Sequence, residues 1–137
     1  MSPGSRPTAE DRIRAALWFA DRGFGVFSVW STRTDGVCRC PAAGSCSSPG
    51  KHPVSGRGFV DATRDPDRIR TLLHAGSSPN WGMVPPEGVF AWDVDSDEER
   101  ARLARLETIH GPLPPTLRTN TAHGQHVFWR WPDGLPR

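Results

Sequence analysis

The chain has 137 residues, a length that suits one compact domain or part of a larger one and allows a sizeable core. An apolar fraction of 36%, with 14 glycines and 14 prolines, indicates a globular, loop-rich protein and excludes a coiled coil, a collagen and a disordered tail. The net charge of +2 does not indicate a nucleic-acid-binding protein, and the lack of a long apolar stretch or signal peptide predicts a cytoplasmic protein without a membrane partner.

The first half of the chain predicts two helices, one strand and a long loop. A Thr-x-x-Asp capping box and apolar residues at helical spacing predict a helix over residues 8–23, which ends at a glycine. Residues 24–30 are aromatic and β-branched, as in a buried central strand. Residues 31–58 are rich in Gly, Ser, Pro and Cys, and a loop of that length needs something to order it. An Asp-Pro pair opens a helix over residues 65–76.

The second half predicts two hairpins and a helix. Strands over residues 80–84 and 89–95 are joined by Pro-Pro-Glu-Gly, which indicates a hairpin. A Ser-x-x-Glu capping box opens an apolar-striped helix over residues 96–111. Residues 116–121 and 125–131 form a second hairpin. The order of elements predicts an α+β fold with a mostly antiparallel sheet and flanking helices.

Three cysteines and one histidine lie within fifteen residues of the long loop: Cys38, Cys40, Cys46 and His52. Four such ligands are what a tetrahedral structural zinc requires, and the metal would explain how the loop over residues 31–58 is ordered. The alternatives are free thiols or one disulfide with an unpaired cysteine, and a disulfide fits poorly with a cytoplasmic protein. We expect zinc to bind here, and we expect its role to be structural, because four protein ligands leave no coordination position open for a substrate.

Asp93 and Asp95 close the apolar strand 89–95 at alternate positions, so their side chains point to one face of the sheet. Two convergent carboxylates can hold Mg²⁺ or Mn²⁺ beside a phosphate. An EF-hand loop starting at Asp93 fails, because its sixth and twelfth positions are Glu98 and Ala104. Capping of the next helix by acidic residues explains Asp97 but not Asp93.

His126 opens the last strand. A histidine at a hairpin is more often structural than catalytic, and its importance depends on whether this strand pairs with the strand that carries Asp93.

Taken together, these features resemble the N-terminal primase–polymerase (Prim-Pol) domain of the bifunctional DNA primase/polymerase family, in the archaeo-eukaryotic primase superfamily of phages, plasmids and mobile elements. The resemblance covers roughly residues 12–132, within a domain that we place at residues 8–132. Four stretches carry it in family order: residues 16–24, the cysteine-rich loop 38–53, residues 62–66 with 80–83, and the motifs at 93–95 and 121–126.

The resemblance implies template-directed nucleotidyl transfer, with single-stranded or primed DNA and nucleoside triphosphates as substrates and a helicase as a further partner. Asp93 and Asp95 would be catalytic and hold the Mg²⁺ or Mn²⁺ ions. His126 would be catalytic and contact the nucleotide phosphates. Three further residues would contact the nucleotide: Gly124, Thr121 and Lys51.

The chain departs from the family pattern in two respects. A Gly-Gln pair precedes His126 where the family usually has two glycines. The third motif of the superfamily supplies a further carboxylate downstream of the histidine, for which Asp133 is a poor substitute. We therefore expect these residues to be the N-terminal portion of a catalytic domain, as a fragment or as a shortened relative.

Two other functions stay open. One is a non-catalytic, zinc-stabilised module that binds nucleic acid or a replication complex. The other is a metal-dependent phosphohydrolase or nuclease that uses the same carboxylates and histidine.

Overall fold

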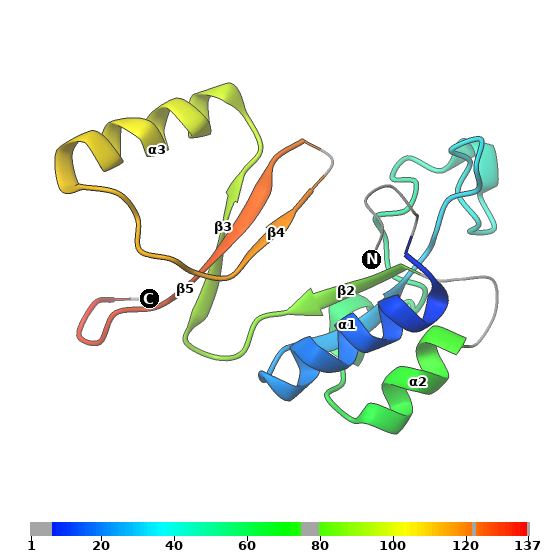
Figure 1. Cartoon of the computed structure of the whole chain (residues 1–137). Coiled ribbons are helices and arrows are strands. Elements are labelled where there is room, and N and C mark those ends of the chain that lie inside the picture. The colour runs from blue at the N-terminus through cyan, green and yellow to red at the C-terminus, as the bar shows by residue number, and fades with distance from the viewer. Residues whose placement is uncertain (1–6, 75–79, 122, 137) are drawn as a thin grey trace. The chain divides into compact units, whose positions relative to one another are not determined.

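The computed structural model describes residues 7–74, 80–121 and 123–136, and the described part of the chain contains three α-helices and two antiparallel sheets (Figure 1). The chain divides into two compact units with the boundary between Pro86 and Glu87. The fold is therefore α+β, as predicted. No helix in the described residues has the length and apolar character needed to cross a membrane.

Two capped helices frame the first unit. Helix α1 (Ala9–Asp21) begins with the predicted capping box, in which the Thr8 hydroxyl accepts the Asp11 N–H and the Asp11 carboxylate accepts the Thr8 N–H. Helix α2 (Pro66–His74) is capped by Asp65, whose carboxylate accepts two backbone N–H groups of the first turn. Both helix starts are confirmed, whereas the predicted end at Gly76 lies outside the described residues.

Strand β1 (Gly25–Val29) pairs antiparallel with β2 (Asn80–Val84), and single bridges to Thr63 and Pro53 also join it to the loop and the segment that follows. Among the described residues, β1 is thus one of only two strands in its sheet, and isolated bridges, not a third strand, flank its other edge, which differs from the predicted central position. The core of the unit lies between α1, α2 and this strand, and its buried residues are Ile13, Ala16, Ala20, Val26, Ile69 and Leu73.

The predicted hairpin between residues 80–84 and 89–95 is wrong. Strand β2 pairs with β1, whereas β3 (Val89–Val94) belongs to the other sheet. Pro85 and Pro86 follow β2 directly, and since proline has no N–H and a fixed φ, this pair favours an extended connection over a tight hydrogen-bonded turn.

The second unit is a three-stranded antiparallel sheet with one helix. The strand order is β3-β5-β4, where β4 is Arg118–Asn120 and β5 is Gln125–Arg130. Strands β4 and β5 pair as the predicted second hairpin, although Ala122 in its turn lies outside the described residues. Strand β5 is central, so its side chains have neighbours on both sides.

Helix α3 (Asp97–His110) begins two residues after the end of β3 and is tied to it by side chains. The Ser96 hydroxyl accepts the Glu99 N–H, but the Glu99 carboxylate accepts the indole N–H of Trp92 at 3.1 Å instead of closing a capping box. The expected box is therefore half formed. Leu103 is the buried position of the predicted apolar stripe, while Leu106 and Ile109 are exposed.

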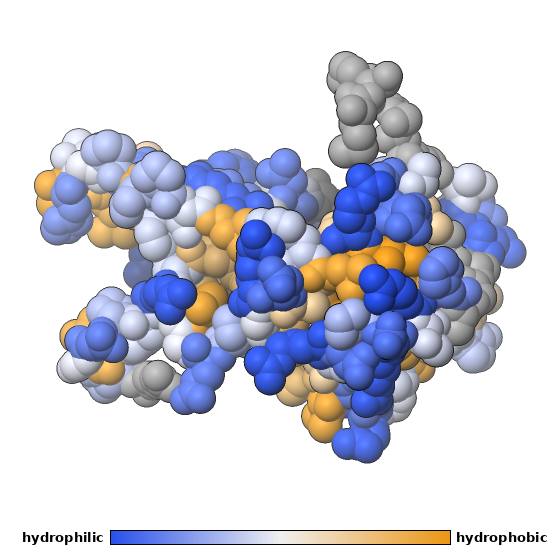
Figure 2. Space-filling model, turned by 60° about the horizontal axis from the view of Figure 1, so that its bottom comes forward, coloured by the Kyte–Doolittle hydropathy of each residue, from blue (hydrophilic) through white to orange (hydrophobic). Residues whose placement is uncertain are grey.

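Polar residues cover most of the face seen in Figure 2, with hydrophobic areas between them. Exposed large apolar side chains occur in both units; they are Trp18, Val54, Phe59, Val60, Leu106, Ile109 and Leu135.

Candidate metal centre and carboxylate–histidine site

The long loop of the first unit gathers its three cysteines and one histidine. The ligand atoms of Cys38, Cys40, Cys46 and His52 all lie within 4.8 Å of one another. The His52 Nε2 is 3.3 Å from the Cys46 sulfur and 3.5 Å from the Cys38 sulfur. Within the described ranges this is the one cluster of three or more Cys, His, Asp or Glu side chains that can hold a metal ion.

This donor set fits zinc. Zn–S bonds of about 2.3 Å in a tetrahedron place sulfur atoms about 3.8 Å apart, so these side chains need small movements at most to close on the metal. The cysteines are free of disulfides, and Cys38 and Cys40 are buried. Four protein ligands would fill the coordination sphere of a bound zinc, as in structural zinc sites.

The environment of the sulfurs favours a thiolate at Cys38. Burial opposes ionisation, but backbone N–H groups of Gly50 and Cys40 and the side chains of Cys40 and His52 outweigh it and lower the Cys38 pKa to about 6. At Cys46, a hydrogen bond from the Ser48 N–H opposes the effect of burial and of the neighbouring thiols, and the net pKa is raised. Because a cysteine must be deprotonated to bind a metal, the lowered pKa of Cys38 favours metal binding.

The loop is held along the edge of β1 by its own backbone. The Trp30 N–H donates to the His52 carbonyl at 3.0 Å, and the Val54 N–H donates to the Ser28 carbonyl at 3.0 Å. Short 3₁₀ turns at Ala43–Ser45 and Gly58–Asp61 interrupt it. The fourth ligand therefore lies beside a regular strand, and Lys51 is exposed next to it.

The second unit brings Asp93 and His126 together. They are cross-strand partners in the β3–β5 register, with the His126 Nε2 3.5 Å from the Asp93 carboxylate. Thr119 of β4 pairs with His126 from the other side. The Asp93 and His126 side chains are 58% and 39% exposed, so both can be reached by a ligand. The strand that carries His126 therefore pairs with the strand that carries Asp93, which is the condition under which His126 gains functional importance.

Asp95 follows β3 directly, two residues after Asp93, and its side chain is exposed. It forms no hydrogen bond or ion pair with the described residues, which leaves its carboxylate oxygens available to a cation. Two carboxylates are the usual protein share of a Mg²⁺ site whose other ligands are water and substrate phosphates. The Asp93 and Asp95 side chains are both exposed and open to a cation, in contrast to the largely buried cysteine cluster.

The turn before His126 is ordered by Thr121 and Gly124. The Thr121 hydroxyl accepts the Gly124 N–H at 2.9 Å, and the Thr121 N–H donates to the Gly124 carbonyl at 2.9 Å. A Cβ atom on Gly124 would lie 2.8 Å from the Asp95 Cα and 2.9 Å from the Val94 carbonyl carbon. Glycine is thus needed here because the turn packs against the backbone that carries Asp95.

Arg100 makes a contact between distant residues that no sequence pattern indicated. Its guanidinium donates to the His123 carbonyl at 3.3 Å and to the Asp97 carboxylate at 2.7 Å, so it links the first turn of α3 to the β4–β5 turn. Because 23 residues separate Arg100 from His123, no local spacing could have indicated this contact.

Comparison with known proteins gives one match. The family model described as "Bifunctional DNA primase/polymerase, N-terminal" matches residues 16–137. No curated protein and no solved structure matches the chain.

Proposed function

The chain belongs to the bifunctional DNA primase/polymerase N-terminal (Prim-Pol) family, and from this premise we propose that it performs template-directed nucleotidyl transfer at the Asp93–His126 site. The family implies DNA and nucleotide substrates in general. The single observation that carries the proposal is the 3.5 Å contact between the Asp93 carboxylate and the His126 imidazole on adjacent strands.

We assign the metal-binding role to Asp93 and Asp95. Mg²⁺ or Mn²⁺ held there would stabilise the charge that develops on the triphosphate during transfer. Asp93 is on a strand paired along its whole length with β5, so its carboxylate is on a rigid element. Asp95 lies beside the Gly124 turn, which limits its backbone movement.

His126 is assigned to the nucleotide phosphates. Its imidazole shares the sheet face with Asp93, so a phosphate bound by the metal ions would lie within reach of the ring. Gly124 and Thr121 act mainly through the shape of the turn, because the Thr121 hydroxyl is occupied by the Gly124 N–H. A phosphate-binding role for Lys51, which is in the first unit, remains a prediction of the resemblance.

We further propose that the domain extends over residues 8–132 and that residues 31–58 are its zinc-ordered loop. Zinc bound by the cysteine cluster would order this loop without taking part in transfer, because no coordination position is left for substrate. A helicase partner and a role in replication of a mobile element remain predictions of the resemblance.

A primer-extension assay tests the proposal. The chain is incubated with a primed template, labelled dNTPs and Mn²⁺, and Asp93→Asn is compared with the matched control Asp97→Asn. Asp97 is a fully exposed carboxylate four residues away, in the first turn of α3. Extension that is lost in Asp93→Asn and kept in Asp97→Asn supports the proposal, whereas extension that survives in Asp93→Asn contradicts it.

The same assay separates the alternative functions. The cysteine cluster is also compatible with a non-catalytic nucleic-acid-binding module, which would bind the template without extending the primer. Metal-dependent degradation of the template would instead indicate a nuclease.

A further inference from the structure

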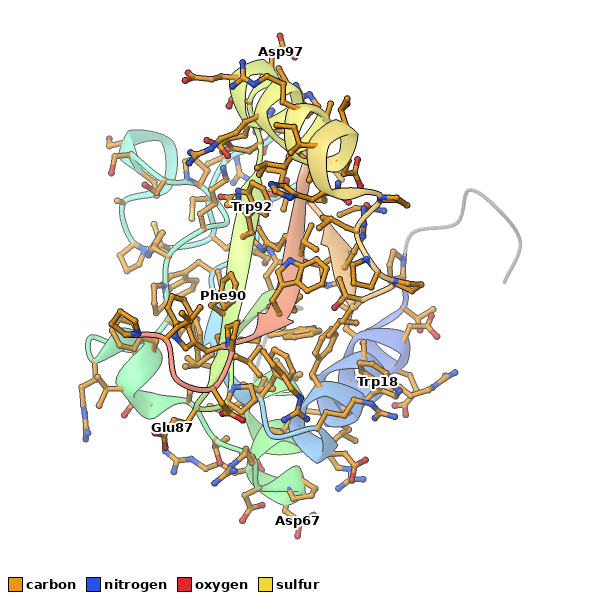
Figure 3. The ribbon with its side chains drawn as sticks, turned by 90° about the vertical axis from the view of Figure 1, so that its left-hand side faces the viewer. Trp18, Asp67, Glu87, Phe90, Trp92 and Asp97 are labelled. Carbon is orange, nitrogen blue, oxygen red and sulfur yellow. The ribbon has the colours of Figure 1, made fainter. Side chains whose placement is uncertain are left out.

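Trp18 differs from the other five tryptophans of the chain in its exposure. It is 43% exposed, whereas Trp30, Trp81, Trp92, Trp129 and Trp131 are all partly covered. Figure 3 shows Trp18 on α1, which belongs to the first unit. The exposed part of the Trp18 indole is the surface that a ligand could reach.

The Trp18 ring is held in one orientation by its neighbours. The Trp18 and Phe19 ring centres are 5.0 Å apart in a T-shaped arrangement with an interplanar angle of 81°, and Phe19 in turn contacts Phe24 and Trp81. The indole is therefore anchored to an aromatic cluster of the first unit. A fixed aromatic surface loses little conformational entropy when a ligand stacks on it.

Arg22 extends this flat surface. Its guanidinium carbon lies 3.6 Å from the centre of the Trp18 ring, and its Nη1 donates to the Trp18 carbonyl at 3.0 Å. The guanidinium thus stacks on the indole while its side chain remains 46% exposed. Nucleobases stack on both tryptophan rings and arginine planes.

An arginine lies at each end of this surface. Arg14 is four residues before Trp18 and Arg22 four residues after it, a spacing of one helical turn or about 6 Å that places all three side chains along one side of α1. Asp11 and Asp21 pair with these arginines at 3.4 and 3.6 Å, but both arginine side chains remain exposed. Exposed pairs contribute little, so phosphate groups can compete for the same guanidinium groups.

We propose that Arg14, Trp18 and Arg22 form a platform for single-stranded nucleic acid, in which a base stacks on the Trp18–Arg22 pair and the arginines contact the flanking phosphates. The proposal rests on the proposed function only for the source of the strand, which would be the template. Its chemistry is independent of Asp93 and His126.

The test is the affinity of the full chain for a fluorescent single-stranded oligonucleotide, measured by anisotropy without added Mg²⁺, Mn²⁺ or nucleotide. Trp18→Ala is expected to weaken binding about tenfold, within the range for loss of one stacked base, and Trp18→Phe to retain most of the affinity. Ile109→Ala removes another exposed apolar side chain and is expected to change nothing. Unchanged binding in Trp18→Ala would overturn the proposal.

The charge contribution is tested by a second pair of variants. Arg22→Ala should weaken binding and reduce the salt dependence by about one phosphate contact, whereas Arg68→Ala, an exposed arginine of α2, should do neither. Equal losses of oligonucleotide affinity in the two variants would mean that the arginines act only through general electrostatic attraction to the nucleic acid, and this would refute the platform. Arg22→Lys keeps the charge but not the plane, and it should lose affinity without a change in salt dependence.

The platform and the proposed catalytic site can fail separately. Asp93→Asn should leave oligonucleotide affinity unchanged while primer extension is lost. If extension fails in every variant but Trp18→Ala still weakens binding, the platform stands and the catalytic proposal does not.

Discussion

Replacement of Gly124 by alanine tests whether the turn before His126 must pack against the end of β3. The added Cβ would be 2.8 Å from the Asp95 Cα and 2.9 Å from the Val94 carbonyl carbon, and closer still to the Val94 oxygen. Ordinary contact begins at 3.4 Å, so the turn or the Asp95 backbone must move by at least about 0.6 Å. Both neighbours are backbone atoms and cannot rotate away as a side chain could.

Two effects of known size follow from this displacement. Overpacking of this kind costs about 1–3 kcal/mol in the free energy of unfolding. A shift approaching 1 Å between Asp95 and His126 would lower the rate of nucleotidyl transfer by about 100-fold, because metal and phosphate contacts would no longer be aligned.

Urea unfolding and primer extension measure the two effects. Gly56→Ala is the matched control, since a Cβ there meets nothing within 4 Å and the residue does not need a positive φ. A Gly124→Ala protein with the stability and the extension rate of the Gly56→Ala control would refute the packing argument.

Four further outcomes can be measured on the same chain. Ile69→Ala leaves a cavity at a fully buried position between the two helices of the first unit and should lower the free energy of unfolding by about 2–5 kcal/mol. Ile109→Ala, on the surface, should change it by no more than about 0.5 kcal/mol, and urea unfolding measures both values. Ser96→Ala removes the cap of α3 and should cost about 1 kcal/mol by the same measurement. Cys38→Ser should abolish stoichiometric zinc binding in metal analysis, and retained zinc would argue against the cluster. Because the folded-state pKa of Cys38 is lowered to about 6 from an ordinary value of 9.0, its thiolate stabilises the metal-free fold fully above pH 9, and this contribution declines as the pH falls and is lost below pH 6. Zinc affinity, measured by competition with a chelator, should also fall as the pH drops through 6, because protons then compete with zinc for the Cys38 sulfur. A zinc affinity that is flat from pH 7.5 to 5.5 would contradict the assignment.

Features set by neighbouring residues were predictable from sequence. The capping residues Thr8, Asp65 and Ser96 act within one turn of their own helices, so their spacing alone identifies the helix starts. The cysteine cluster was equally predictable from sequence, because all four ligands lie within fifteen residues.

Features that depend on distant residues were not predictable. The pairing of Asp93 with His126 joins residues 33 positions apart, and only the strand register of the folded sheet establishes it. The wrong hairpin has the same origin, since β2 and β3 are close in sequence but belong to different sheets. Glu99 also had two possible partners, and the indole of Trp92 competes successfully with the helix cap.

The most direct test of the catalytic assignment measures the binding of Mn²⁺ together with a dNTP by electron paramagnetic resonance. The free Mn²⁺ signal should fall when the chain and dNTP are both present, and the effect should be lost in Asp93→Asn but kept in Asp97→Asn. Equal Mn²⁺–dNTP binding by Asp93→Asn and the unaltered chain would contradict the assignment of a metal–nucleotide site to the Asp93–His126 pair.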